Sequence, residues 1–186
     1  MNSQCKRHNR LNTLACVMAV LVSLLMPVVT QAADWLRWRN VGAATFTWGP
    51  FTLYHAQLLS PDGRYNGLSS DLALVITYQR AINHTDLVDA TRDQWQDLGI
   101  LQETPQSTMW LQALEQLWPD VTPGSQLAFV TTQHQGQFWY RPGSASPFSP
   151  LGPQQSSLFS ERFLAIWLDP RTAYPNLRQQ LMGEKP

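Results

Sequence analysis

Cysteine is scarce in this sequence, which contains only Cys5 and Cys16. Both cysteines lie in residues 1–32, a segment that we predict to be a signal peptide. A mature domain spanning residues 33–186 would contain no cysteine, which excludes disulfides, a thiol nucleophile and cysteine-ligated metal. Its stability must come from an apolar core, to which eight tryptophans and seven phenylalanines can contribute.

The signal-peptide prediction depends on a short apolar run. Lys6, Arg7 and Arg10 precede an uncharged stretch from Leu14 to Val29, and the small-residue pattern Thr-Gln-Ala at 30–32 follows. The run is shorter than the ~20 residues that span a bilayer, so cleavage is favoured over a retained membrane helix. We therefore expect a periplasmic or secreted protein with no stable membrane span after cleavage.

Basic residues are also few. The whole sequence has 13 basic and 13 acidic residues, and loss of Lys6, Arg7 and Arg10 with the signal peptide leaves 10 basic against 13 acidic. Lys185 is then the only lysine, and no cluster of positive charge remains. This balance disfavours nucleic acid and anionic membranes as partners.

The pattern of apolar residues predicts an α+β domain. Alternating or β-branched runs indicate strands at 43–48, 51–59, 71–78, 126–132 and 137–141, with a hairpin turn in "HQGQ" at 134–137. Helical spacing indicates helices at about 83–98, 105–117, 161–168 and 175–183, with Thr85 and Ser160 as N-caps. The segment 144–153 is rich in Pro, Ser and Gly and predicts a loop. Runs of strands and runs of helices favour an antiparallel sheet with helices on one face.

Motifs for reaction chemistry are largely missing. His55, His84 and His134 lack the spacing of a metal site, so we expect no metal. No Gly-x-Ser-x-Gly elbow and no glycine-rich phosphate loop occurs, so we expect no cofactor. Four aspartates share one stripe of the first predicted helix, which is typical of a solvated face: Asp86, Asp89, Asp93 and Asp97.

Several segments, taken in order, resemble the bacterial chalcone isomerase-like proteins. The resemblance implies an open-faced β-sandwich, in which a large antiparallel sheet packs against a helical layer and a ligand lies in a cleft between them. Relatives in plants close a flavanone ring or bind fatty acids, and both use an arginine near a tyrosine. The segments are "VGAATFTWGPFTLYHAQLLS" (41–60), "LALVITYQRAI" (72–82), "LWPDVTPGSQLAFV" (117–130), "IWLDP" (166–170) and "LRQQLMG" (177–183).

The sequence departs from this family at the basic residue. Tyr54 matches the family tyrosine, but residues 44–53 contain no Arg or Lys, and Ala-Thr-Phe-Thr at 44–47 stands where the arginine is expected. His55 stands where many bacterial relatives have an acid. We therefore expect neither chalcone isomerisation nor fatty-acid binding of the plant kind, unless Arg80 or Arg141 reaches the cleft. Catalytic residues stay unknown, and the candidates for ligand binding are Thr45, Thr47, Tyr54 and Tyr78.

Three functions remain open from the sequence. The first is a non-enzymatic, exported chalcone isomerase-like protein that binds a small apolar ligand or a protein partner. The second is an isomerase or lyase acting on a polyphenol or enone, with Tyr54 as acid or base and Thr45 or Thr47 as hydrogen-bond donor. The third is a structural or interaction protein of the cell envelope whose cleft is filled by its own side chains.

Overall fold

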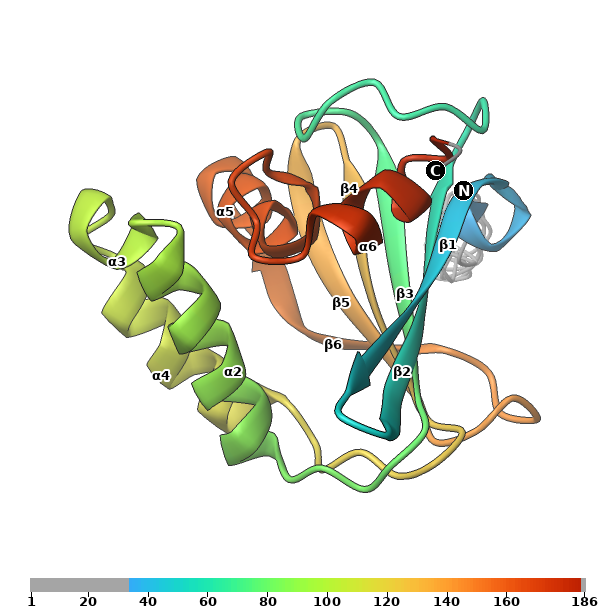
Figure 1. The fold of residues 1–186 in the computed structure, drawn as a ribbon, viewed down its shortest axis with the longest axis horizontal. Coiled ribbons are helices and arrows are strands. Elements are labelled where there is room, and N and C mark those ends of the chain that lie inside the picture. The colour runs from blue at the N-terminus through green and yellow to red at the C-terminus, as the bar shows by residue number, and fades with distance from the viewer. Residues whose placement is uncertain (1–33, 185–186) are drawn as a thin grey trace, which may run out of the picture. The chain divides into compact units, whose positions relative to one another are not determined.

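The computed structural model describes residues 34–184 of the chain (Figure 1). The predicted signal peptide, residues 1–32, lies outside the described residues. Within them, six strands form an antiparallel sheet in which the strands follow one another in chain order. The strands are β1 (Arg39–Trp48), β2 (Phe51–Ser60), β3 (Leu72–Tyr78), β4 (Gln126–Thr132), β5 (Gln135–Arg141) and β6 (Ser149–Gln155).

The helices occupy two places in this order. One group leaves the sheet after β3 and returns before β4, and an isolated bridge between Ile82 and Val121 joins the two ends of this excursion. Another pair follows β6. The predicted α+β class with an antiparallel sheet is thus confirmed. The helical elements are η2 (Asp34–Arg37) before the sheet, α2 (His84–Asp97), α3 (Ile100–Glu103) and α4 (Ser107–Leu117) in the excursion, and α5 (Ser157–Leu168) and α6 (Pro175–Leu181) at the end.

Alternation along β3 divides the apolar residues between the two sheet faces. Leu72, Leu74 and Ile76 belong to the main core, together with side chains from α2, α4, α5 and α6. Ala73 and Val75 belong to a smaller cluster built around Trp35 of η2. The main helices therefore cover one face, while the described residues cover the other face only around this smaller cluster.

Aromatic rings make up much of the main core. Phe129 of β4 packs against Phe138 of β5 and Phe163 of α5, with ring centroids 4.6 and 4.8 Å apart. Trp95 of α2 is fully buried, and its indole Nε1 donates a hydrogen bond of 3.0 Å to the carbonyl oxygen of Arg162. These contacts supply the large buried apolar surface that a domain without disulfides needs.

Helix α6 lies directly against β1 at Gly42. A Cβ atom added to this glycine would come within 2.1 Å of the carbonyl oxygen of Gln180 and 2.6 Å of that of Leu181. The helix in turn buries Leu177 and Leu181 in the main core. The absence of a side chain at Gly42 therefore allows α6 to dock on the sheet.

The predicted loop at 144–153 is wrong in its second half, because Ser149–Gln155 forms β6. This strand pairs with β5 alone, at the end of the sheet. Prolines are tolerated at a sheet edge, where one side of the strand needs no backbone donors. Pro150 and Pro153 make the segment look like a loop in composition although pairing with β5 holds it extended.

Several predicted boundaries also need correction. Helix α2 is capped by Asn83, whose side chain accepts from the backbone N–H of Asp86, and not by Thr85. Helix α5 begins at Ser157 with Ser156 as its cap, several residues ahead of the predicted cap Ser160. Strand β1 extends back to Arg39, β5 begins at Gln135, and α4 begins at Ser107 after the short helix α3, which we did not predict.

Candidate functional site

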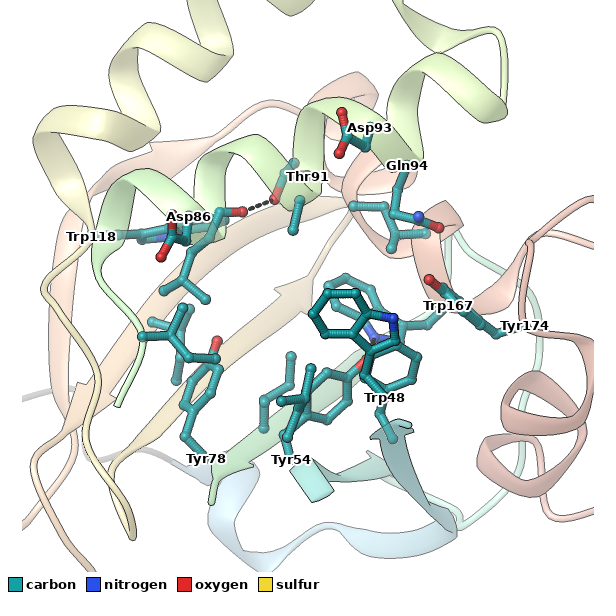
Figure 2. A pocket seen from close by; sticks show the side chains of 18 of the residues that line it. Trp48, Tyr54, Tyr78, Asp86, Thr91, Asp93, Gln94, Trp118, Trp167 and Tyr174 are labelled. Carbon is teal, nitrogen blue, oxygen red and sulfur yellow. Dashed lines mark hydrogen bonds between the residues drawn. The ribbon is translucent and has the colours of Figure 1, made fainter. Parts of the chain in front are cut away.

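A cavity of about 560 Å³ lies between the helix-covered face of the sheet and helices α2 and α5 (Figure 2). Strands β1 to β4 form its floor, and α2, α5 and the segment before α6 form its walls. Most of its surface is apolar or aromatic. The side chains that line it include Phe46, Trp48, Leu53, Tyr54, Tyr78, Asp86, Ala90, Asp93, Gln94, Trp118, Phe163, Trp167 and Tyr174.

The floor carries aromatic rings at matching positions on three neighbouring strands. Phe46 of β1 pairs with Tyr54 of β2, which pairs in turn with Tyr78 of β3. The rings of Phe46 and Tyr54 stack with centroids 5.1 Å apart, and those of Tyr54 and Tyr78 meet edge to face at 6.4 Å. Tyr174, which precedes α6, closes against Phe46 at 4.8 Å. Cross-strand register therefore places a continuous aromatic row under the cavity.

The hydroxyl of Tyr54 is held in place from α5. The indole Nε1 of Trp167 donates to the Tyr54 hydroxyl oxygen at 3.1 Å. Burial raises the pKa of Tyr54 to about 12, the Trp167 hydrogen bond opposes this rise, and nearby Tyr174 adds to it. Tyr54 is thus a neutral phenol at physiological pH, and its O–H group can donate a hydrogen bond to a ligand.

Tyr78 adds a second phenol to the cavity floor. Its side chain is only 4% exposed, and within residues 34–184 its hydroxyl makes no hydrogen bond to protein. Burial, and secondarily the neighbouring Tyr54, raises the pKa of Tyr78. A phenol that lines a cavity can form a hydrogen bond to a ligand atom there.

Thr45 and Thr47, the other two candidates from the sequence, do not line this cavity. Thr45 points to the opposite side of β1, where its Oγ1 lies 2.8 Å from Nδ1 of His55 in an exposed pair. Both threonines border a shallower hollow of about 280 Å³ between β1 and α6. The structure therefore brings Tyr54 and Tyr78 together at the cavity and separates the two threonines from them.

No lysine, arginine or histidine lines the cavity among the residues that the structure describes. The guanidinium of Arg80 lies over the ring of Phe51, 4.1 Å from its centroid. That of Arg141 contacts Gln126 Oε1 and lies over the ring of Phe148, 4.4 Å from its centroid. Neither of the two arginines named from the sequence borders the cavity.

Side chains that the sequence did not single out supply the rest of the site. Trp48, Trp118 and Trp167 line the cavity from β1, the end of α4 and α5, and Trp48 is 75% exposed. In Figure 2, Trp48 lies in front of Tyr54 and Trp167. Asp86 and Asp93 are exposed, as predicted, but they also border the cavity on α2. In the sequence, the three- and four-residue spacing of Asp86, Ala90 and Asp93 indicates that they share one side of the helix, and this pattern could have predicted that they border the same cavity.

Other kinds of site find no support in residues 34–184. No group of three or more His, Cys, Asp or Glu side chains could hold a metal ion there. His84 instead contacts Asp120, with Nδ1 2.7 Å from the carboxylate, beside the start of α2. Over the same residues no helix combines the length and the apolar character needed to cross a bilayer.

Comparison with known proteins gives a relative but no family. No protein-family model matches the sequence. The chain is similar to an uncharacterized protein of Haemophilus influenzae, with 27% identity over 164 residues that cover 87% of this chain and 77% of that protein. The similarity thus extends over most of both chains and carries no functional description.

Proposed function

We propose that this chain is an exported, non-enzymatic protein of the chalcone isomerase-like kind that holds a small, largely apolar ligand between its sheet and helices. The observation that carries the proposal is the aromatic cavity of about 560 Å³. Its volume falls within the ~300–1,000 Å³ typical of small-molecule sites. The arrangement of sheet, helical layer and cavity is the one that the sequence resemblance implies.

The polar groups in the cavity suit a ligand that carries a hydrogen-bonding group on an apolar body. Tyr54 and Tyr78 can each donate a phenolic proton, and Gln94 lies on the wall above them. Few polar groups in an otherwise apolar site orient a ligand without demanding a charged one.

The enzyme alternative receives less support. With a pKa of about 12, Tyr54 would not serve as a base near neutral pH, because a base works best with a pKa near the working pH. No cation borders the cavity within the described residues, so an enolate or phenolate would lack its main stabilising partner. Loss of such a donor commonly costs a factor of ~10²–10³ in rate.

The structural alternative predicted a cleft filled by the protein's own side chains. An open cavity weighs against it, since empty apolar space costs folding stability and is usually kept for function. The binding hypothesis also allows a protein partner in place of a small molecule. Native mass spectrometry of the purified protein distinguishes the two by the mass of any bound species.

The binding test uses Ala90, which lines the cavity from α2. We expect Nile red, a neutral apolar dye, to bind the wild type with a rise in fluorescence, and Ala90→Trp to weaken binding at least about fivefold by filling space. Ala113→Trp, at an exposed position of α4 that does not line the cavity, is the matched control. Equal binding by wild type and both variants would contradict the proposal.

The enzyme alternative has its own test. Chalcone absorbance should not change beyond the uncatalysed rate when the wild-type protein is added. Cyclisation by the wild type that is abolished in Tyr54→Phe would replace binding with catalysis as the function. Export is tested separately, by cell fractionation and by the N-terminal residue of the mature chain.

A further inference from the structure

We propose that the ligand of this cavity is an organic cation: an apolar body that carries an amine or quaternary ammonium group. The inference rests on the proposed binding function and specifies its ligand class. It follows from three features of the cavity taken together, which are its aromatic lining, its two carboxylates and the lack of any bordering basic group among residues 34–184.

Aromatic rings surround the cavity from several directions. Phe46, Tyr54 and Tyr78 supply the floor, and Trp48, Trp118 and Trp167 supply the sides and the mouth. The faces of such rings attract ammonium groups, with tryptophan the most effective, and the attraction grows when the site excludes water. Cages of this composition recognise quaternary ammonium ions in other proteins.

Within residues 34–184, the charged side chains that border the cavity are all acidic. Asp86 and Asp93 border it from α2, two turns apart and so about 10 Å apart along the helix. Arg92, on the same helix, contacts Asp89 and is not part of the lining. In Figure 2, Asp86 lies on the side of the cavity near Tyr78 and Trp118. Among the described residues, an anionic ligand would meet two carboxylates and no basic partner, whereas a cation would be attracted by the carboxylates and by the aromatic rings.

The two phenols on the cavity floor fit the same ligand class. Tyr78 is 4% exposed and lines the cavity, and its hydroxyl oxygen can accept from an ammonium N–H as well as donate. Tyr54 accepts from Trp167 and keeps a second lone pair. A primary amine could therefore pair with the phenol oxygens while its apolar body lies on the aromatic floor.

The test compares three compounds with one apolar body and different head groups: phenylbutyltrimethylammonium, phenylbutanol and phenylbutyrate. Isothermal titration calorimetry at low ionic strength gives their affinities for the mature protein. We expect the cation to bind roughly tenfold more tightly than the alcohol, and phenylbutyrate to bind more weakly than the alcohol. Raising the salt should weaken the cation selectively, because the carboxylates are exposed and screened.

Matched variants assign the effect to named side chains. Asp86→Asn should lower the affinity for the cation about two- to fivefold and leave that for the alcohol unchanged. Asp97→Asn, on the same helix but outside the lining, should change neither. Trp48→Leu should reduce the preference for the cation over the alcohol about threefold or more.

The outcomes separate this inference from the function on which it rests. Equal affinity for cation and alcohol, or a cation preference that Asp86→Asn and Asp97→Asn leave equally intact, would overturn the inference while binding of apolar ligands still stands. If none of the three compounds binds the wild type, both proposals fail.

Discussion

Replacing Gly42 with alanine tests how tightly α6 is docked on the sheet. The new Cβ would lie 2.1 Å from the carbonyl oxygen of Gln180, 2.6 Å from that of Leu181 and 2.7 Å from the backbone nitrogen of Gly183. All three are backbone atoms, so no side-chain rotation relieves the contact. Since ordinary carbon contacts begin at about 3.4 Å, the helix must move by roughly 1 Å or more.

The cost follows from what α6 buries. Leu181 is fully buried and Leu177 nearly so, and both belong to the main core. Burial of a leucine side chain is worth about 1.5–3 kcal/mol. Losing a good part of that packing for both, or straining β1 instead, gives an expected loss of about 2–4 kcal/mol in the free energy of unfolding.

Urea unfolding followed by tryptophan fluorescence measures this loss. Gly143→Ala is the matched control, because a Cβ there meets no atom within 4 Å and the backbone is not left-handed. That variant should unfold at the wild-type midpoint or slightly above it, since alanine restricts the unfolded chain. If Gly42→Ala unfolded within about 0.5 kcal/mol of Gly143→Ala, the close docking of α6 on β1 would be refuted.

Two further predictions concern the tyrosines and the start of α2. Spectrophotometric titration should show Tyr54 ionising near pH 12, and Tyr78 also later than a free phenol, because burial raises both pKa values. Between these pH values the folded state holds protons that the unfolded state has released. The stabilising contribution is therefore complete below about pH 10 and is lost as the pH rises toward 12, by about 3 kcal/mol for Tyr54. Tyrosines that all titrate near pH 10 while the protein stays folded would contradict this prediction. Asn83→Ala should lower the free energy of unfolding in urea by about 1 kcal/mol through loss of the helix cap. Thr85 donates its hydroxyl to Glu115 at the surface, so Thr85→Ala should lower it by less than half of that. The reverse order would restore Thr85 as the cap.

Local patterns were sufficient for most of the fold. The run "DLALVITY" predicts a buried strand, because it is short, nearly all apolar and includes β-branched residues, and β3 does contribute to both clusters. The α2 pattern ends at Gly99, whose positive φ suits a helix stop. In both cases the decisive interactions lie within a few residues of sequence.

Strand β6 shows where local reasoning fails. Its partners are residues of β5, and Pro150 sits opposite Trp139 in the register. Nothing inside the segment itself favours an extended strand, since its composition is that of a loop. The hydrogen bonds that define it come from another strand, and sequence periodicity does not report them.

The cavity was predicted only in part, because several of its lining residues come from segments that are distant in the sequence. Tyr54 was named through the family resemblance, and its neighbour Tyr78 was named as a candidate on the following strand. Trp118 and Trp167 come from the ends of α4 and α5, segments that meet only in the folded domain. Thr45 alternates with Phe46 along β1, so the same strand that directs Phe46 to the cavity directs Thr45 away from it.

The helical excursion between β3 and β4 also bears on how the chain folds. The remaining neighbouring strands are joined by short connections, whereas β3 and β4 are joined by residues 79–125, which must be brought together before these two strands can pair. Closing so long a loop costs about 3 kcal/mol more than closing a two-residue hairpin. We therefore expect completion of the sheet centre to be the slow, entropy-limited step, with the two halves of the sheet forming as separate hairpin units before it.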